Sequence, residues 1–143
     1  MNQNAIFLPF LVLMSLTIVV WFVMYARRIP LSIRSGLHPN KLTPQELARI
    51  SPPAVSNPSD NLKNLFELPV IFYALTLYLY VVGEVDALYL ALAWTFAGLR
   101  IAHSIVHCTF NTVLVRFGIY VLSALVLWAM VVRALLQFTS SMA

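Results

Sequence analysis

The chain has 143 residues, of which 61% are hydrophobic and only 10% are charged. Soluble domains have about 45–50% apolar and about 25% charged residues, so this composition excludes a soluble globular domain. It indicates an integral membrane protein with a single domain over residues 1–143. The formal net charge of +4 comes mostly from one stretch after residue 26, with no interleaved exposed aromatic residues, so we expect no nucleic-acid partner.

Four segments are apolar and long enough to cross about 30 Å of hydrocarbon. The first, residues 5–26, contains no charged residue, and its basic residues follow it, which argues against a cleaved signal peptide. The others are predicted at residues 62–82, 87–107 and 113–138. In lipid every backbone polar group must be satisfied within the protein, so each span is a helix. We therefore predict an all-α, integral membrane four-helix bundle.

The charges of the connections predict the orientation of the bundle. The longest connection, residues 27–61, has an excess of basic residues, whereas the connection after the second span contains Glu84 and Asp86 and no basic residue. Basic connections stay on the cytoplasmic side. We expect residues 27–61 to be cytoplasmic and both termini to lie on the non-cytoplasmic side.

The long connection also contains helix signals. Thr43, Pro44 and Glu46 form a capping box with proline at the first helical position, which predicts a short helix from Pro44 to Ile50. Downstream, Ser59 or Asp60 is predicted to cap the second span.

Polar side chains on three spans share faces that meet at the cytoplasmic end of the predicted bundle. On the second span these are Asp60, Asn64 and Glu67, on the third Arg100, His103, His107 and Asn111, and on the fourth Arg116. Spacings of three and four place residues on one face of a helix. A charged side chain at mid-bilayer costs roughly 2.5–3.5 kcal/mol on insertion scales and usually marks function. The convergence therefore indicates a site.

A structural reading of the same residues stays open. Glu67 and Arg100 are also placed to form a bridge between two helices. His103 and His107 lie one turn apart, as metal ligands do, but a third ligand would have to be Glu67, and we expect no metal site. Arg133, near the outer end of the fourth span, is expected to snorkel to the headgroups.

Two stretches, NPSDNLKNLFELPVIFYAL and GLRIAHSIVHCTFNTVLVRFGIY, resemble the MAPEG family, the membrane-associated proteins in eicosanoid and glutathione metabolism. The resemblance is greatest to the bacterial members and runs from the second span to the start of the fourth. It implies a homotrimer of four-helix subunits in a bacterial inner membrane. It also implies that glutathione, as co-substrate, binds between neighbouring subunits toward the cytoplasmic side.

Site residues are carried over from the family by position. The residues matching glutathione contacts are Asn64, Glu67, Arg100, His103, His107 and Tyr120. Arg116 matches the arginine proposed to stabilise the glutathione thiolate, so it is the predicted catalytic residue. His107 stands where the family often has tyrosine. Asp60 replaces an arginine that grips a glutathione carboxylate in eukaryotic members, and Phe117 replaces a small polar residue.

The resemblance implies a glutathione-dependent membrane transferase or peroxidase that activates a thiolate toward lipophilic electrophiles brought by the lipid bilayer. Another low-molecular-weight thiol stays open as the co-substrate. One alternative is a non-catalytic membrane protein that retains the fold, with the polar stripes serving helix and subunit packing. Another is a small transporter or ion-conducting bundle, which would need a polar track through the outer half, where the fourth span offers only Arg133.

Overall fold

The computed structural model describes residues 2–41 and 43–142, and every regular element within them is a helix. Four helical segments among these residues are long and apolar enough to cross a membrane. The elements are η1 Gln3–Ile6, α1 Phe7–Arg34, η2 Pro39–Lys41, α2 Pro44–Ile50, α3 Pro53–Leu65, α4 Leu68–Val82, α5 Ala87–Cys108 and α6 Val113–Met142. The prediction of an all-α, four-helix membrane bundle is confirmed.

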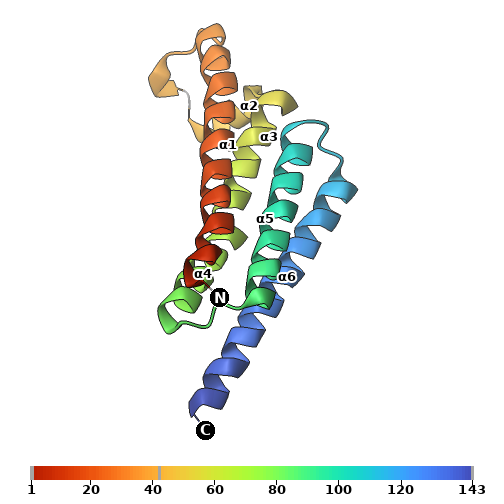
Figure 1. Ribbon diagram of the computed structural model, residues 1–143. Helices are drawn as coiled ribbons and strands as arrows, with labels where there is room; N and C mark the ends of the chain where they lie inside the picture. Colours follow the sequence, from red (N-terminus) through yellow and green to blue (C-terminus); the bar gives the residue numbers. More distant parts are fainter. Residues whose placement is uncertain (1, 42, 143) are drawn as a thin grey trace.

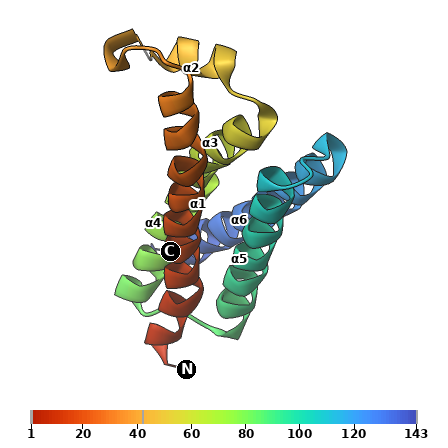
Figure 2. The ribbon, with the colours of Figure 1, turned by 90° about the horizontal axis from the view of Figure 1, so that it is seen from above.

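The four segments alternate in direction, so the chain begins and ends at the same end of the bundle (Figure 1). Helix α5 packs along α6, and α1 packs against α3 and α5. The short helix α2 and the turn between α5 and α6 lie at the opposite end (Figures 1 and 2). We call the two ends the terminal end and the α2 end. Which end faces the cytoplasm stays a prediction.

Helix α1 continues past residue 26, where the first span was expected to end, as far as Arg34. Pro30 lies inside it, at the cost of one helical hydrogen bond. The chain turns away at Gly36, whose φ of 65° is a conformation that glycine adopts without strain. Arg27 and Arg28 therefore lie on a helix, which shortens the expected connection.

The short helix α2 is confirmed with the bounds and the cap expected from the sequence. It spans Pro44–Ile50, and the Thr43 hydroxyl accepts a hydrogen bond from the Glu46 amide at 3.2 Å. Arg49 pairs with Glu46 on its exposed face at 2.5 Å. Local capping chemistry alone is sufficient to define this element.

Helix α3 begins at Pro53, so the expected start at residues 59–60 is wrong. Proline fits the first helical position because its missing N–H has no helical partner there. Pro58 lies inside α3 and cannot donate to the carbonyl of Ala54. The Arg27 guanidinium donates to that carbonyl instead, with Nη1 2.9 Å from the oxygen. A contact with another helix therefore makes this proline tolerable.

The second span is two helices with a break between them. Phe66 and Glu67 leave the helical conformation, with φ of −102° and −98°. Pro69 lies in the first turn of α4, and its ring would clash with the carbonyl of Leu65 in a continuous helix. Glu67 therefore does not continue the polar face of α3, contrary to the expectation of one unbroken stripe.

The apolar core extends from the terminal end to the middle of the bundle. Phe72 of α4 and Phe96 of α5 stack at its centre with ring centroids 4.8 Å apart, and both are fully buried. The outward faces of the four segments expose large apolar side chains, which suit contact with lipid. Most of the buried polar residues lie toward the α2 end, namely Asn57, Asn61, Arg100, His103, Ser104 and His107.

Candidate functional site

A hollow of about 330 Å³ lies toward the α2 end, between α3, α5 and α6. It is lined by Asn64, His103, Val113, Leu114, Arg116, Phe117 and Tyr120. Four of the predicted site residues therefore line one hollow, although they come from three different helices. The other three, Glu67, Arg100 and His107, contact these four directly.

Asn64 and the two histidines form the polar wall of the hollow. The Asn64 side-chain nitrogen lies 3.5 Å from His103 Nε2 and 3.4 Å from His107 Nδ1. His103 Nδ1 lies 3.2 Å from the carbonyl oxygen of Arg116. A carbonyl only accepts hydrogen bonds, so Nδ1 of His103 carries a hydrogen and is the donor of this hydrogen bond. His103 thereby ties α5 to the first turn of α6.

Arg100 is fully buried, and within the described residues it lacks the ion pair that the structural reading required. Its Nη2 donates to the carbonyl of Asn64 at 2.8 Å and so satisfies the end of α3 beside the helix break. Its Cζ lies 5.3 Å from the ring centroid of Tyr120. Among the described residues, Nε and Nη1 have no hydrogen-bond partner. A buried charge in this state is costly unless a further group approaches it.

Glu67 lies at the helix break and is exposed. It accepts a hydrogen bond from the Tyr120 hydroxyl at 3.4 Å. Within residues 2–41 and 43–142 the ion pairs are Arg49–Glu46, Lys63–Asp60 and Arg133–Asp86. The carboxylate of Glu67 is therefore free of ionic partners in this part of the chain.

Arg116 is half-buried at the start of α6, and its guanidinium is held by an asparagine. Its Nη1 donates to Asn111 Oδ1, and Asn111 Nδ2 donates to Asn57 Oδ1 at 3.0 Å. Asn57 and Asn61 are buried on α3, and sequence reasoning missed both. Together with Asn64 they repeat at intervals of four and three, a signal that becomes visible once α3 starts at Pro53.

Asp60 is exposed and bound to Lys63, with Nζ 2.8 Å from Oδ1. Neither residue lines the hollow beside Arg116. No group of three or more His, Cys, Asp or Glu side chains placed to hold a metal ion occurs in the described part of the chain.

A different polar cluster lies at the terminal end. Arg133 forms an ion pair with Asp86, and its Cζ lies 4.1 Å from the ring centroid of Tyr89. The expectation that Arg133 snorkels to the headgroups stays a prediction, and the partner of Arg133 within the protein is Asp86. The Tyr89 hydroxyl donates to Gln137 Oε1 at 2.5 Å. The hydrogen bond from Arg133 lowers the pKa of Asp86 from the ordinary 3.8 to about 2.

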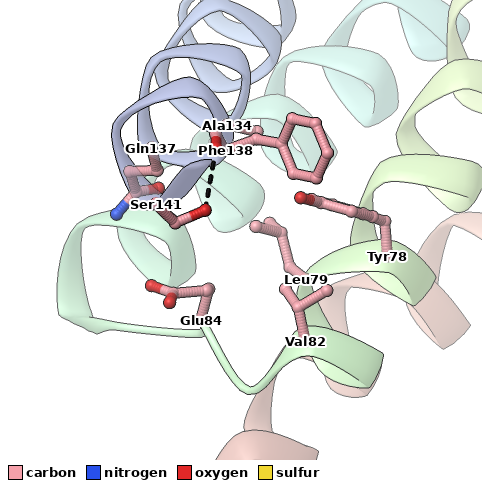
Figure 3. A pocket seen from close by; sticks show the side chains of 8 residues that line it. All are labelled: Tyr78, Leu79, Val82, Glu84, Ala134, Gln137, Phe138 and Ser141. Atoms are coloured by element: carbon pink, nitrogen blue, oxygen red, sulfur yellow. Dashed lines mark hydrogen bonds between the residues drawn. The ribbon is translucent and has the colours of Figure 1, made fainter. Parts of the chain in front are cut away.

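A hollow of about 290 Å³ also lies at the terminal end, between α4 and α6 (Figure 3). It is lined by Tyr78, Leu79, Val82, Glu84, Ala134, Gln137, Phe138 and Ser141. Glu84 is the only charged residue among these. Stabilising a thiolate needs a nearby cation, so this hollow does not suit thiolate chemistry.

Comparison with known proteins identifies the family of the chain. It matches no curated protein and no solved structure. The sequence model of the MAPEG family matches residues 6–136, which include all four membrane-spanning segments nearly entire and every residue of the site. A match over this much of the chain shows that the protein belongs to the MAPEG family.

Proposed function

We propose that the protein is a glutathione-dependent membrane transferase or peroxidase that activates a thiolate toward lipophilic electrophiles. Membership of the MAPEG family, which includes such enzymes, supports this proposal. The observation that carries it is Arg100, a fully buried cation with two N–H groups unpartnered among the described residues. Packing alone gives no reason to bury such a group.

The unpartnered N–H groups of Arg100 suit a carboxylate. Each N–H of a guanidinium can donate a charge-assisted hydrogen bond to a carboxylate oxygen. Glutathione carries two carboxylates and one ammonium group. Arg100 would donate to glutathione carboxylate oxygens through its unpartnered Nε and Nη1, and Glu67, whose carboxylate has no ionic partner in this part of the chain, would accept the ammonium group.

Arg116 would activate the thiol of glutathione. A thiol has a pKa of about 8.5, so at neutral pH only a few per cent is the nucleophilic thiolate. A guanidinium beside the sulfur favours the charged form and lowers the pKa of the thiol. The thiol proton passes to water, the sulfur forms a bond with the electrophilic carbon, and the leaving group departs with its electron pair. In this transferase step glutathione supplies only the sulfur nucleophile, whereas in a peroxidase step two glutathione thiols would also supply the two electrons that reduce the peroxide and would end as a disulfide.

The remaining predicted residues would bind and orient the tripeptide. Asn64, His103 and His107 lie side by side on the wall of the hollow and offer donors and acceptors for its amide groups. Tyr120 contacts Glu67 through its hydroxyl and Arg100 through the face of its ring, and would keep these two charged groups in place.

The second substrate would arrive from lipid. Leu114 and Phe117 line the same hollow as Arg116, and they are 83% and 63% exposed. An apolar electrophile concentrates in the bilayer and would reach the sulfur along this apolar rim without passing through water. Phe117 thus takes part in binding the electrophile.

The assembly and orientation follow the same proposal. We place the α2 end at the cytoplasmic face of a bacterial inner membrane, since the basic residues of segment 27–61 lie toward it. Both termini then face the other side. The subunits would form a homotrimer with glutathione, or another low-molecular-weight thiol, bound between neighbours.

The test uses the full chain purified in detergent. Millimolar glutathione should raise the melting temperature, because a ligand that binds only the folded protein stabilises it. Arg116→Ala should lower kcat/KM for conjugation of a chlorodinitrobenzene by about 10²–10³-fold, the usual cost of removing one preorganised donor. It should weaken glutathione binding far less.

Arg49→Ala is the matched control, because it removes an exposed arginine from the same end of the bundle. It should leave binding and conjugation unchanged. Equal losses of binding and conjugation in Arg116→Ala would make Arg116 a binding residue only. No thermal shift with glutathione or any other small thiol would favour the non-catalytic alternative.

A further inference from the structure

The turn between α5 and α6 holds one residue in an unusual conformation. Asn111 has a φ of 47°, and it is the only non-glycine residue with positive φ in the described part of the chain. Its amide donates to the carbonyl of Val106 at 2.8 Å. Asparagine adopts this left-handed region more readily than other residues with a side chain. The backbone therefore favours glycine, asparagine or aspartate here, and the choice of asparagine calls for a reason in the side chain.

The turn is fixed from outside as well. Arg27 Nη1 donates to the carbonyl of Cys108 at 3.2 Å and to that of Ala54 at 2.9 Å. One guanidinium thus joins α1, the start of α3 and the end of α5. The contact of Arg27 with Cys108 fixes the position at which the turn begins, and it restricts the movement of Asn111.

Both ends of the Asn111 side chain are occupied. Oδ1 accepts from Arg116 Nη1, and Nδ2 donates to Asn57 Oδ1 at 3.0 Å. A guanidinium only donates, so the amide must present its oxygen to Arg116 and its nitrogen to Asn57. Asn57 is 8% exposed on α3 and anchors the amide from behind. Asn57, Asn111 and Arg116 thus form a chain of hydrogen bonds that runs from α3 to the hollow.

We propose that Asn111, held by Asn57, is a positioning residue that aims the Arg116 guanidinium into the hollow and leaves its positive charge unneutralised. This inference rests on the proposed role of Arg116. An arginine side chain has many rotamers, and ordering it costs conformational entropy. If the side chain is already ordered in the free enzyme, this cost is not added to the barrier of the reaction.

An amide and a carboxylate would orient Arg116 equally well but differ in charge. A carboxylate at this place would offset the field that favours the thiolate, since it would add a negative charge next to the guanidinium. A neutral amide orients the guanidinium and adds no charge. This difference makes the proposal distinct from a purely structural role, because only the proposed role predicts a shift of the pH midpoint in the isosteric substitution Asn111→Asp.

The experiment compares three variants of the full chain in detergent. Asn111→Asp keeps the shape, the turn and the bond to Arg116, but adds a negative charge. Its second carboxylate oxygen replaces the donor to Asn57 Oδ1, so Asn57 must turn its side-chain amide to donate to it. Asn111→Gly keeps the left-handed backbone and removes the amide. Thr109→Val is the matched control, because the exposed hydroxyl of Thr109 donates back to the last turn of α5, to the carbonyl of Ile105 at 2.6 Å, and not to Arg116.

The readouts are the melting temperature, the dissociation constant of glutathione, and the pH profile of kcat/KM with a chlorodinitrobenzene. Ultraviolet absorbance of the bound thiolate gives the pKa of the thiol independently. We expect Asn111→Asp to keep or raise the melting temperature while moving the pH midpoint upward by about one unit. Conjugation at neutral pH should fall about tenfold. Asn111→Gly should move the midpoint in the same direction, and Thr109→Val should leave it unchanged.

A pH midpoint unchanged in Asn111→Asp would overturn the inference and leave the proposed function standing, with Asn111 only part of the turn. If Asn111→Gly does not fold, Asn111→Asp decides alone. A wild-type protein with neither bound thiolate nor conjugation overturns the proposed function and, with it, the role of Asn111. The two failures are therefore distinguishable.

Discussion

The two ends of the bundle treat their polar residues in opposite ways. At the terminal end the polar groups that join the helices have close partners: Arg133 binds Asp86, the Tyr89 hydroxyl binds Gln137, and the side-chain amide of Gln3 makes two hydrogen bonds to the backbone of Val85 at 3.1 and 2.9 Å. Such mutual pairing is sufficient to explain why these residues are present, as contacts that join the helices.

At the α2 end the pairing is incomplete. Arg100 is fully buried with two nitrogens unpartnered in the described residues. The contacts of Asn64 with His103 and His107 are long, at 3.5 and 3.4 Å, near the limit for a hydrogen bond. Completed pairing thus marks the structural end, and incomplete pairing marks the end where we propose that a ligand completes it.

The largest effect that tests this contrast is expected from Arg100→Met. Exchanging a buried charge for an apolar side chain of similar length is often neutral for folding, so we expect a change in the free energy of unfolding within about 1 kcal/mol. Glutathione binding should weaken by at least about 30-fold, which corresponds to about 2 kcal/mol for loss of a buried ionic contact. Thermal melts and calorimetric titration in detergent measure both quantities.

Normal glutathione binding in Arg100→Met, together with a large loss of stability, would show that Arg100 serves packing. The two ends would then not differ in kind. Arg100→Lys sharpens the test, because lysine keeps the charge but lacks the N–H donors of the guanidinium. We expect it to bind glutathione more weakly than the wild type.

The opposite pattern is expected from Arg133→Met at the terminal end. It removes an ion pair and a contact with the face of Tyr89. A partly exposed ion pair contributes about 0–1 kcal/mol and a cation–π contact about 0.5–1 kcal/mol, so the free energy of unfolding should fall by about 1–2 kcal/mol. The affinity for glutathione should stay at the wild-type value. A fall in that affinity without a fall in stability would contradict the division between the ends.

Much of this contrast could be anticipated from sequence. Charge-free apolar segments predict spans directly, and the Thr43 cap predicted α2 with its observed bounds. Asn64, His103 and Arg116 were expected to converge because helical spacing and the alternation of spans suffice to place residues at one depth. They do line one hollow. These features depend on local patterns and topology, which a single sequence contains.

What could not be predicted depends on contacts between distant segments. Pro58 signals the start of a helix when read locally, and only the donation from Arg27 to Ala54 shows why it lies inside α3. In the same way, Arg133 has no visible partner in its own span, because Asp86 is 47 residues away. Asn57 was missed for the same reason, since a misplaced helix start removed it from the polar face of α3.

The smallest effect we expect is a loss of stability in acid. The pKa of Asp86 is about 2 in the folded protein, below the ordinary 3.8, mainly because Arg133 donates a hydrogen bond to its carboxylate. A folded pKa below the unfolded one means that the ion pair stabilises the protein fully above about pH 4 and loses this effect as the pH falls toward about 2. The side chain of Asp86 is 46% exposed, so screening by water should limit the contribution to under about 1 kcal/mol.

Melting temperatures of the wild type and of Asp86→Asn, measured from pH 5 to about 2, test this expectation. Asparagine still caps α5 through the Tyr89 amide, which Asp86 now binds at 2.9 Å. Only the charge is removed, and the two melting curves should therefore converge as the pH falls. Parallel curves would mean that the ion pair adds no stability. The structural end would then be held by its apolar contacts and its neutral hydrogen bonds, and complete pairing would no longer be evidence of a stabilising role.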